Sequence, residues 1–117
     1  GSPAEFKDIT LSDYVGDRYT SLTEDPYQKG FVSNYARSHY SEDVAETCGR
    51  LISLTEAERE AMIAKAGPVG GPLIRKKYDM LKKWLKDSYG VDTDRWCEIY
   101  HRRIAQLDNL DWESLDK

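Results

Sequence analysis

Apolar side chains recur at helical spacing through the second half of this 117-residue sequence, and this pattern limits the fold more than any other feature. The run Ile74, Tyr78, Leu81 and Leu85 is spaced by three or four residues, so these side chains share one face of a helix. The pattern predicts a mainly α fold. We expect a small helical domain of about four helices, preceded by a long irregular segment over residues 7–40.

Capping residues set the expected ends of the first two helices. Ser41 is the expected N-cap of a helix over about residues 42–53. Thr55 and Glu58 have the spacing of a capping box, in which each side chain bonds the backbone N–H of the other residue. This box predicts a second helix that ends at Gly67–Pro68.

The next two helices are marked by breakers and a further cap. The segment Gly70–Gly71–Pro72 is expected to break the chain, with its proline in the first turn of a third helix that ends at Tyr89–Gly90. Asp92 or Thr93 caps a fourth helix. One side of this helix carries Trp96, Ile99, Tyr100, Arg103 and Leu107.

Composition fits one small globular domain, with 39% hydrophobic and 32% charged residues. The net charge of −4 argues against nucleic acid as a partner, and no apolar run approaches the roughly 20 residues of a membrane span.

Residues 1–6 have the sequence of an expression-vector remnant, so we expect natural sequence upstream to be missing. Residues 7–117 form the single expected domain, irregular over 7–40 and helical over 41–108.

Cys48 and Cys97 are the only cysteines. Both fall on apolar faces of expected helices, which favours two buried free thiols over a disulfide. These two cysteines do not indicate whether the protein works in an oxidising or a reducing compartment.

Three carboxylates gather where the first long helix is expected to begin: Glu42, Asp43 and Glu46. Glu42 and Glu46 are one helical turn apart and project from one face, where like charges repel. The helix dipole also favours carboxylates near a helix N-terminus, so the cluster alone does not indicate a ligand site. Tyr35 precedes Glu42 by seven residues and lies in the polar loop that leads into the helix.

The stretch from Gly30 to Glu46 resembles a family of zinc-binding metallopeptidases through its Gly-Phe-Val-Ser-x-Tyr-Ala-Arg-Ser segment and the following Glu-Asp-Val-Ala-Glu. These substrate-import-associated zinc metallohydrolases are found as lipoproteins near carbohydrate-import systems of gut Bacteroidetes. The resemblance covers nearly the whole chain after residue 6. The arrangement is gluzincin-like and similar to the site of anthrax lethal factor. The His-Glu-x-x-His helix of a gluzincin is absent, so the chain resembles the C-terminal part only.

The resemblance implies a role for each residue of this cluster. Glu42 is implied to be the third zinc ligand, and Tyr35 to hydrogen-bond the transition state. Glu46 is implied to orient a ligand histidine from the missing part, with Asp43 as the alternative for that role. Zinc is therefore expected in the full-length parent, whereas this chain alone is expected to hold none and to be inactive.

Histidine and lysine patterns elsewhere carry less information. His39 lies three residues before Glu42, but His101 is distant in sequence and shares no ligand-spacing motif with it, so a self-contained metal site is not expected. A basic run in the third expected helix is typical of a solvated helix face. Its members are Arg75, Lys76, Lys77, Lys82, Lys83 and Lys86.

The expected function is thus that of a C-terminal fragment of a zinc-dependent metallopeptidase. Its expected partners are the upstream His-Glu-x-x-His subdomain of the same polypeptide and a peptide or protein substrate. The resemblance implies an exported parent, either an outer-membrane lipoprotein or a cell-surface protein. The alternative is a non-catalytic helical binding module associated with glycan import. A face left uncovered by the missing part would also favour self-association.

Overall fold

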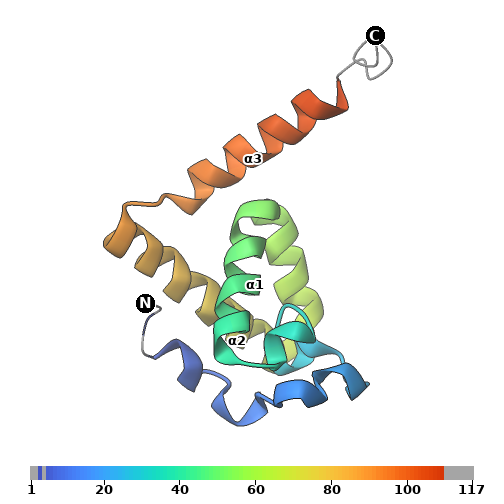
Figure 1. The fold of residues 1–117 in the computed structure, drawn as a ribbon. Coiled ribbons are helices and arrows are strands. Elements are labelled where there is room, and N and C mark those ends of the chain that lie inside the picture. Colours follow the sequence, from blue (N-terminus) through green and yellow to red (C-terminus); the bar gives the residue numbers. More distant parts are fainter. Residues whose placement is uncertain (1–2, 4, 110–117) are drawn as a thin grey trace.

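The computed structural model describes residue 3 and residues 5–109, and this part of the chain folds entirely into helices and their connections (Figure 1). The α-helices are α1 (Tyr40–Ser53), α2 (Glu56–Tyr89) and α3 (Thr93–Asp108). They follow the 3-10 helices η1 (Phe6–Asp8), η2 (Leu11–Asp13), η3 (Gly16–Ser21), η4 (Pro26–Lys29) and η5 (Tyr35–Arg37). The mainly α prediction is confirmed. Within the described residues, no helix combines the length and apolar character needed to cross a membrane.

Most of the predicted caps are present. Thr55 accepts a hydrogen bond from the Glu58 backbone N–H at 3.1 Å, and the Glu58 carboxylate accepts one from the Thr55 N–H at 2.9 Å. The Asp92 side chain caps α3 by accepting from the backbone N–H groups of Asp94 and Arg95. Ser41 was the wrong N-cap for α1. The extended backbone of His39, with φ −151° and ψ 155°, precedes the first helical residue instead.

The long helix α2 breaks at Gly67, where the second helix was predicted to end, but the helix continues through residues 70–72, where a further break was predicted. Gly67 has φ 88° and ψ −175°, a conformation that glycine adopts readily, and this kink divides α2 into two helices. The helix that follows the kink begins at Pro68, whose fixed φ suits a first helical turn. The four predicted helices therefore exist, but Pro72 lies inside the third rather than at its start.

Gly70 and Gly71 are buried because other backbone passes close to them. A Cβ atom on Gly70 would lie 1.9 Å from the Tyr27 carbonyl oxygen, and one on Gly71 would lie 2.6 Å from that of Ile63. The pair thus serves close packing within the helix. A Gly-Gly-Pro sequence is compatible with a turn and with a closely packed helix. The sequence alone did not distinguish the two, so a break was predicted where the helix continues.

The hydrophobic core lies between α1, both halves of α2 and the N-terminal 3-10 segment. It consists of Phe6, Val32, Leu51, Ile63, Ala66, Ile74, Tyr78 and Leu81. The predicted core-facing stripe of the third helix is confirmed at three positions in this list. Phe6 falls in the segment assigned above to a vector remnant, yet its side chain is fully buried and belongs to this core. Burial raises the pKa of Tyr78 to about 12.

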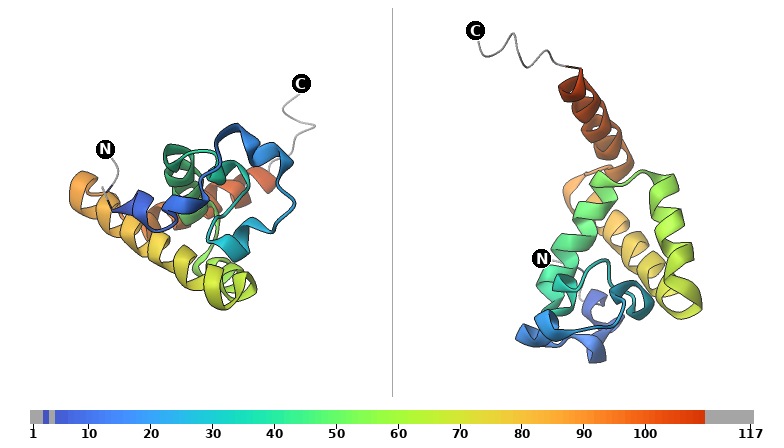
Figure 2. Two further views of the ribbon diagram at one scale, coloured as in Figure 1. Left: turned by 90° about the horizontal axis from the view of Figure 1, so that it is seen from below. Right: turned by 90° about the vertical axis from the view of Figure 1, so that its right-hand side faces the viewer.

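α3 projects away from the rest of the domain, and only its N-terminal part contacts the other helices (Figure 2). Thr93 and Cys97 are buried in that contact. Much of the predicted apolar side of this helix is nevertheless exposed. Its exposed large residues are Trp96 (53%), Tyr100 (40%), Ile104 (38%) and Leu107 (46%). We call these four residues the α3 stripe.

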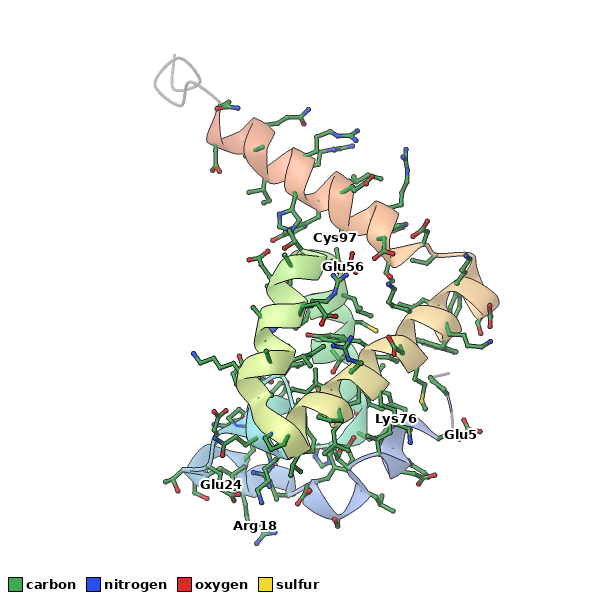
Figure 3. All side chains as sticks on the ribbon, turned by 180° about the vertical axis from the view of Figure 1, so that it is seen from behind. Glu5, Arg18, Glu24, Glu56, Lys76 and Cys97 are labelled. Carbon is green, nitrogen blue, oxygen red and sulfur yellow. The ribbon has the colours of Figure 1, made fainter. Side chains whose placement is uncertain are left out.

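Both cysteines are free thiols, as predicted. Cys97 lies where α3 meets the junction of α1 and α2, near Glu56 (Figure 3), and its sulfur is 3.1 Å from the Leu54 carbonyl oxygen. Cys48 is half-buried on α1, and burial raises its pKa to about 11.

Two glycine-to-alanine substitutions should have opposite effects on stability. Gly70→Ala places a methyl group against backbone of the η4 segment, so we expect a loss of at least about 1–3 kcal/mol. Gly49→Ala adds the same methyl group where nothing lies within 4 Å inside helix α1, so we expect a gain of about 0.5–1 kcal/mol. Urea unfolding of both variants measures the difference. Equal effects would contradict the close approach at residue 70.

Candidate functional site

The candidate site is formed by the first turns of α1 and by the loop of residues 30–38 that packs against them. Gly30 ends η4 with φ 90°, and this left-handed residue turns the chain so that Phe31 enters the interior, where it is fully buried. Farther along, the Val15 N–H donates to the Arg37 carbonyl at 2.8 Å, which ties the loop to the N-terminal segment. The loop is therefore held on both sides of Tyr35.

A buried ion pair anchors the first turns of α1. The Lys77 ammonium donates to the Asp43 carboxylate at 2.7 Å and to the Gly30 carbonyl at 2.8 Å. The Tyr14 hydroxyl donates to the same carboxylate oxygen at 2.6 Å, and the Thr47 hydroxyl donates to the other oxygen at 3.2 Å. The Asp43 side chain is fully buried, and both of its oxygens are engaged within the domain.

Lys77 does not belong to the solvated basic face to which the sequence analysis assigned it. Its side chain is 1% exposed, and its ammonium lies 3.8 Å from the centre of the Phe31 ring. Burial lowers the pKa of Lys77 and raises the pKa of Asp43, while their mutual attraction opposes both shifts. One sequence signal was available: Lys77 follows Ile74 by three residues and therefore falls on the core-facing side of the helix.

Tyr35 and Glu42 lie together at the surface. Tyr35 is 43% exposed and packs edge-on against Tyr19, with ring centroids 5.3 Å apart. Hydrogen bonding and charge from Glu42 raise the pKa of Tyr35 above its usual value. The structure thus brings together the two residues that the resemblance implies to be the transition-state group and the metal ligand.

Glu46 lies one turn farther along α1 and is linked to the same loop. The Ser33 hydroxyl donates to the Glu46 carboxylate at 3.0 Å and accepts the Ala36 N–H at 3.1 Å. Glu42 and Glu46 are both partly exposed, whereas Asp43 between them points inward. Ser33, Tyr14 and Lys77 were not predicted from the sequence to belong to this arrangement, because their contacts join separate elements.

The two histidines do not join this cluster into a metal centre. His39 is exposed at the start of α1, and His101 lies on α3 beside Cys97 and Glu98 at the far end of α1. In the part of the chain that the structure describes, no group of three His, Cys, Asp or Glu side chains is placed to hold a metal ion. Glu42 has the chemistry and exposure of one carboxylate ligand, so the residues present fit part of a zinc site.

Residues 2–94 match the model of the family described as "Putative zinc-binding metallo-peptidase", and the chain belongs to this family. Its fold is also similar to the crystal structure of a "putative zinc-binding metallo-peptidase" from Bacteroides caccae ATCC 43185, with a TM-score of 0.83 and 32% sequence identity. The match covers 95% of this chain but 43% of that one. No curated protein matches the sequence.

Replacement of Lys77 should strongly destabilise the domain. Lys77→Met leaves the Asp43 carboxylate buried without its cation, which costs about 3–5 kcal/mol, measured by urea unfolding. Lys76→Met is the matched control, because that neighbouring lysine is exposed and its loss should change stability by less than about 0.5 kcal/mol. Lys77→Met combined with Asp43→Asn should recover part of the loss. Equal effects of the two single substitutions would rule out the anchoring role.

The contact between Tyr35 and Glu42 can be tested by titration. Glu42→Gln removes the negative charge that disfavours the tyrosinate, so the pKa of Tyr35 should fall toward its ordinary value of 10.0. Nuclear magnetic resonance of ¹³Cζ-labelled tyrosine measures this pKa directly. Glu98→Gln, an exposed glutamate on α3, serves as the control and should leave it unchanged. A Tyr35 pKa that is insensitive to both substitutions would place Glu42 out of contact.

Proposed function

We propose that this chain carries the second half of a zinc metallopeptidase site, with Glu42 as its metal ligand and Tyr35 as its transition-state group. The observation that supports this most directly is the contact of a partly exposed tyrosine with a partly exposed carboxylate at the start of α1. Asp43 is held inward by Lys77, so the carboxylates available to a ligand on this face are Glu42 and Glu46. Family membership supports zinc as the metal.

Each residue has a defined task in this proposal. A bound zinc ion would supply an activated water and polarise the scissile carbonyl. A tyrosine hydroxyl of ordinary pKa already carries its proton at neutral pH, so Tyr35 can donate a hydrogen bond to the oxyanion that develops during amide hydrolysis. Glu46 accepts from Ser33 through one oxygen, and its second oxygen can accept from a histidine ligand and orient the imidazole.

The proposed site needs ligands from a longer polypeptide. Three protein ligands and one open position are typical of catalytic zinc, and Glu42 supplies one of the three. We therefore propose that an upstream His-Glu-x-x-His subdomain supplies two histidines and the general base, that peptides or proteins are the substrates, and that this chain alone is inactive. The length of the Bacteroides caccae neighbour, of which this chain spans less than half, supports a longer parent. Export as a lipoprotein is proposed from the sequence resemblance alone.

Isothermal titration calorimetry with zinc tests the proposal on this chain and on a longer chain that includes the upstream segment. We expect tight binding by the longer chain only, because a single carboxylate does not hold zinc strongly. Glu42→Gln in the longer chain should weaken binding by about 10- to 100-fold or more, and Glu98→Gln should not. Peptide cleavage by the longer chain should be abolished by a chelator.

Two results would contradict this assignment. Chelator-sensitive cleavage by the 117-residue chain would show that it contains a complete site. Failure of the longer chain to bind zinc would leave the fold of a metallopeptidase without its chemistry.

A non-catalytic binding module is the second candidate function, and the α3 stripe is the observation that favours it. Four large apolar side chains are exposed on one helix that projects from the domain. Clusters of this kind mark interaction surfaces in soluble proteins. Absence of a His-Glu-x-x-His sequence upstream, together with concentration-dependent sedimentation of this chain, would favour this function over the peptidase.

A further inference from the structure

We propose that Ser33 is a positioning residue that holds Tyr35 beside Glu42 by tying the turn that carries Tyr35 to α1. This inference rests on the proposed function, since it assigns a catalytic purpose to the Tyr35–Glu42 contact. The hydroxyl of Ser33 is the connecting atom: it accepts the Ala36 N–H at 3.1 Å and donates to Glu46 at 3.0 Å.

The second of these bonds separates Ser33 from an ordinary turn residue. A serine that only starts a short helical turn needs to accept one nearby backbone N–H, as Ser33 does from Ala36. The hydroxyl of Ser33 also donates a hydrogen bond. Its acceptor is a carboxylate thirteen positions away on α1. A hydrogen bond to a charged acceptor is stronger than a neutral one, so this link restrains the distance between the turn and the helix.

Two further contacts leave Tyr35 little freedom. The Ser38 hydroxyl donates to the Tyr35 carbonyl at 2.7 Å, which holds the backbone of the turn from its other end. The ring of Tyr19 packs edge-on against the ring of Tyr35 at 5.3 Å. Of these contacts, the bond from Ser33 to Glu46 is the one that places the turn relative to the helix carrying Glu42. Catalytic groups act efficiently only when they are held close to their productive geometry.

The catalytic test uses the longer, zinc-binding chain. Ser33→Ala should lower kcat for peptide hydrolysis by about tenfold or more while KM and zinc affinity stay within about twofold, because the hydrogen bond of Tyr35 acts in the transition state. Ser33→Thr keeps the hydroxyl and should restore most of the activity. Ser12→Ala, at an exposed position on η2, is the matched control and should change none of these quantities.

The structural test uses the 117-residue chain and needs no activity. Ser33→Ala should weaken the nuclear Overhauser effect between the rings of Tyr19 and Tyr35 and should speed amide exchange at Ala36 by at least about tenfold, because that N–H loses its acceptor. Ser33→Thr should preserve both signals.

The outcomes separate the two proposals. Failure of the unsubstituted longer chain to bind zinc would overturn the proposed function whatever Ser33 does, and the ring contact would then decide alone whether Ser33 positions Tyr35. An active longer chain whose Ser33→Ala variant keeps full kcat would overturn the positioning role and leave the proposed function standing. An unchanged ring contact in the variant would overturn it as well.

Discussion

The arrangement of this domain depends on the buried ammonium of Lys77. It joins three parts of the chain, since it extends from α2 to Asp43 on α1, to the Gly30 carbonyl in the loop and to the face of Phe31. Removing two charges from water is costly, so such a pair is a poor source of stability compared with apolar packing. Its consequence is specificity. A packing of α2 against α1 that buried either of these charges without the other would carry a large penalty, which disfavours such alternatives.

The same interaction divides the carboxylates of α1 between two tasks. Asp43 is held inward by Lys77, and successive residues of a helix point about 100° apart, so Glu42 cannot share that direction. Glu46 lies one turn beyond Glu42 on the same side and meets the loop through Ser33. The ion pair therefore orients the helix so that two of its acidic side chains face outward beside Tyr35.

Features of the fold and of the candidate site could be predicted from the sequence where the interacting residues are close together in the chain. The capping box at Thr55 and the contact between Tyr35 and Glu42 join residues a few positions apart, and such spacings are visible in a sequence. Gly70 was wrongly predicted to lie in a break. A glycine is needed there because the carbonyl of Tyr27, from another part of the chain, approaches it closely. Lys77 was missed for a similar reason, since the partners that make a buried lysine tolerable are distant in sequence.

The position of the candidate site on α1 limits what can complete it. Hydrolytic chemistry at zinc is favoured by surroundings from which bulk water is excluded. Tyr35 is 43% exposed, so this face supplies donor and acceptor groups but no enclosure. α3 cannot supply that enclosure, because Cys97 fixes its start against Leu54 at the opposite end of α1 (Figure 1). Under the proposed function, the histidine-bearing part must therefore cover the N-terminal end of α1, which leaves the α3 stripe available for a different contact.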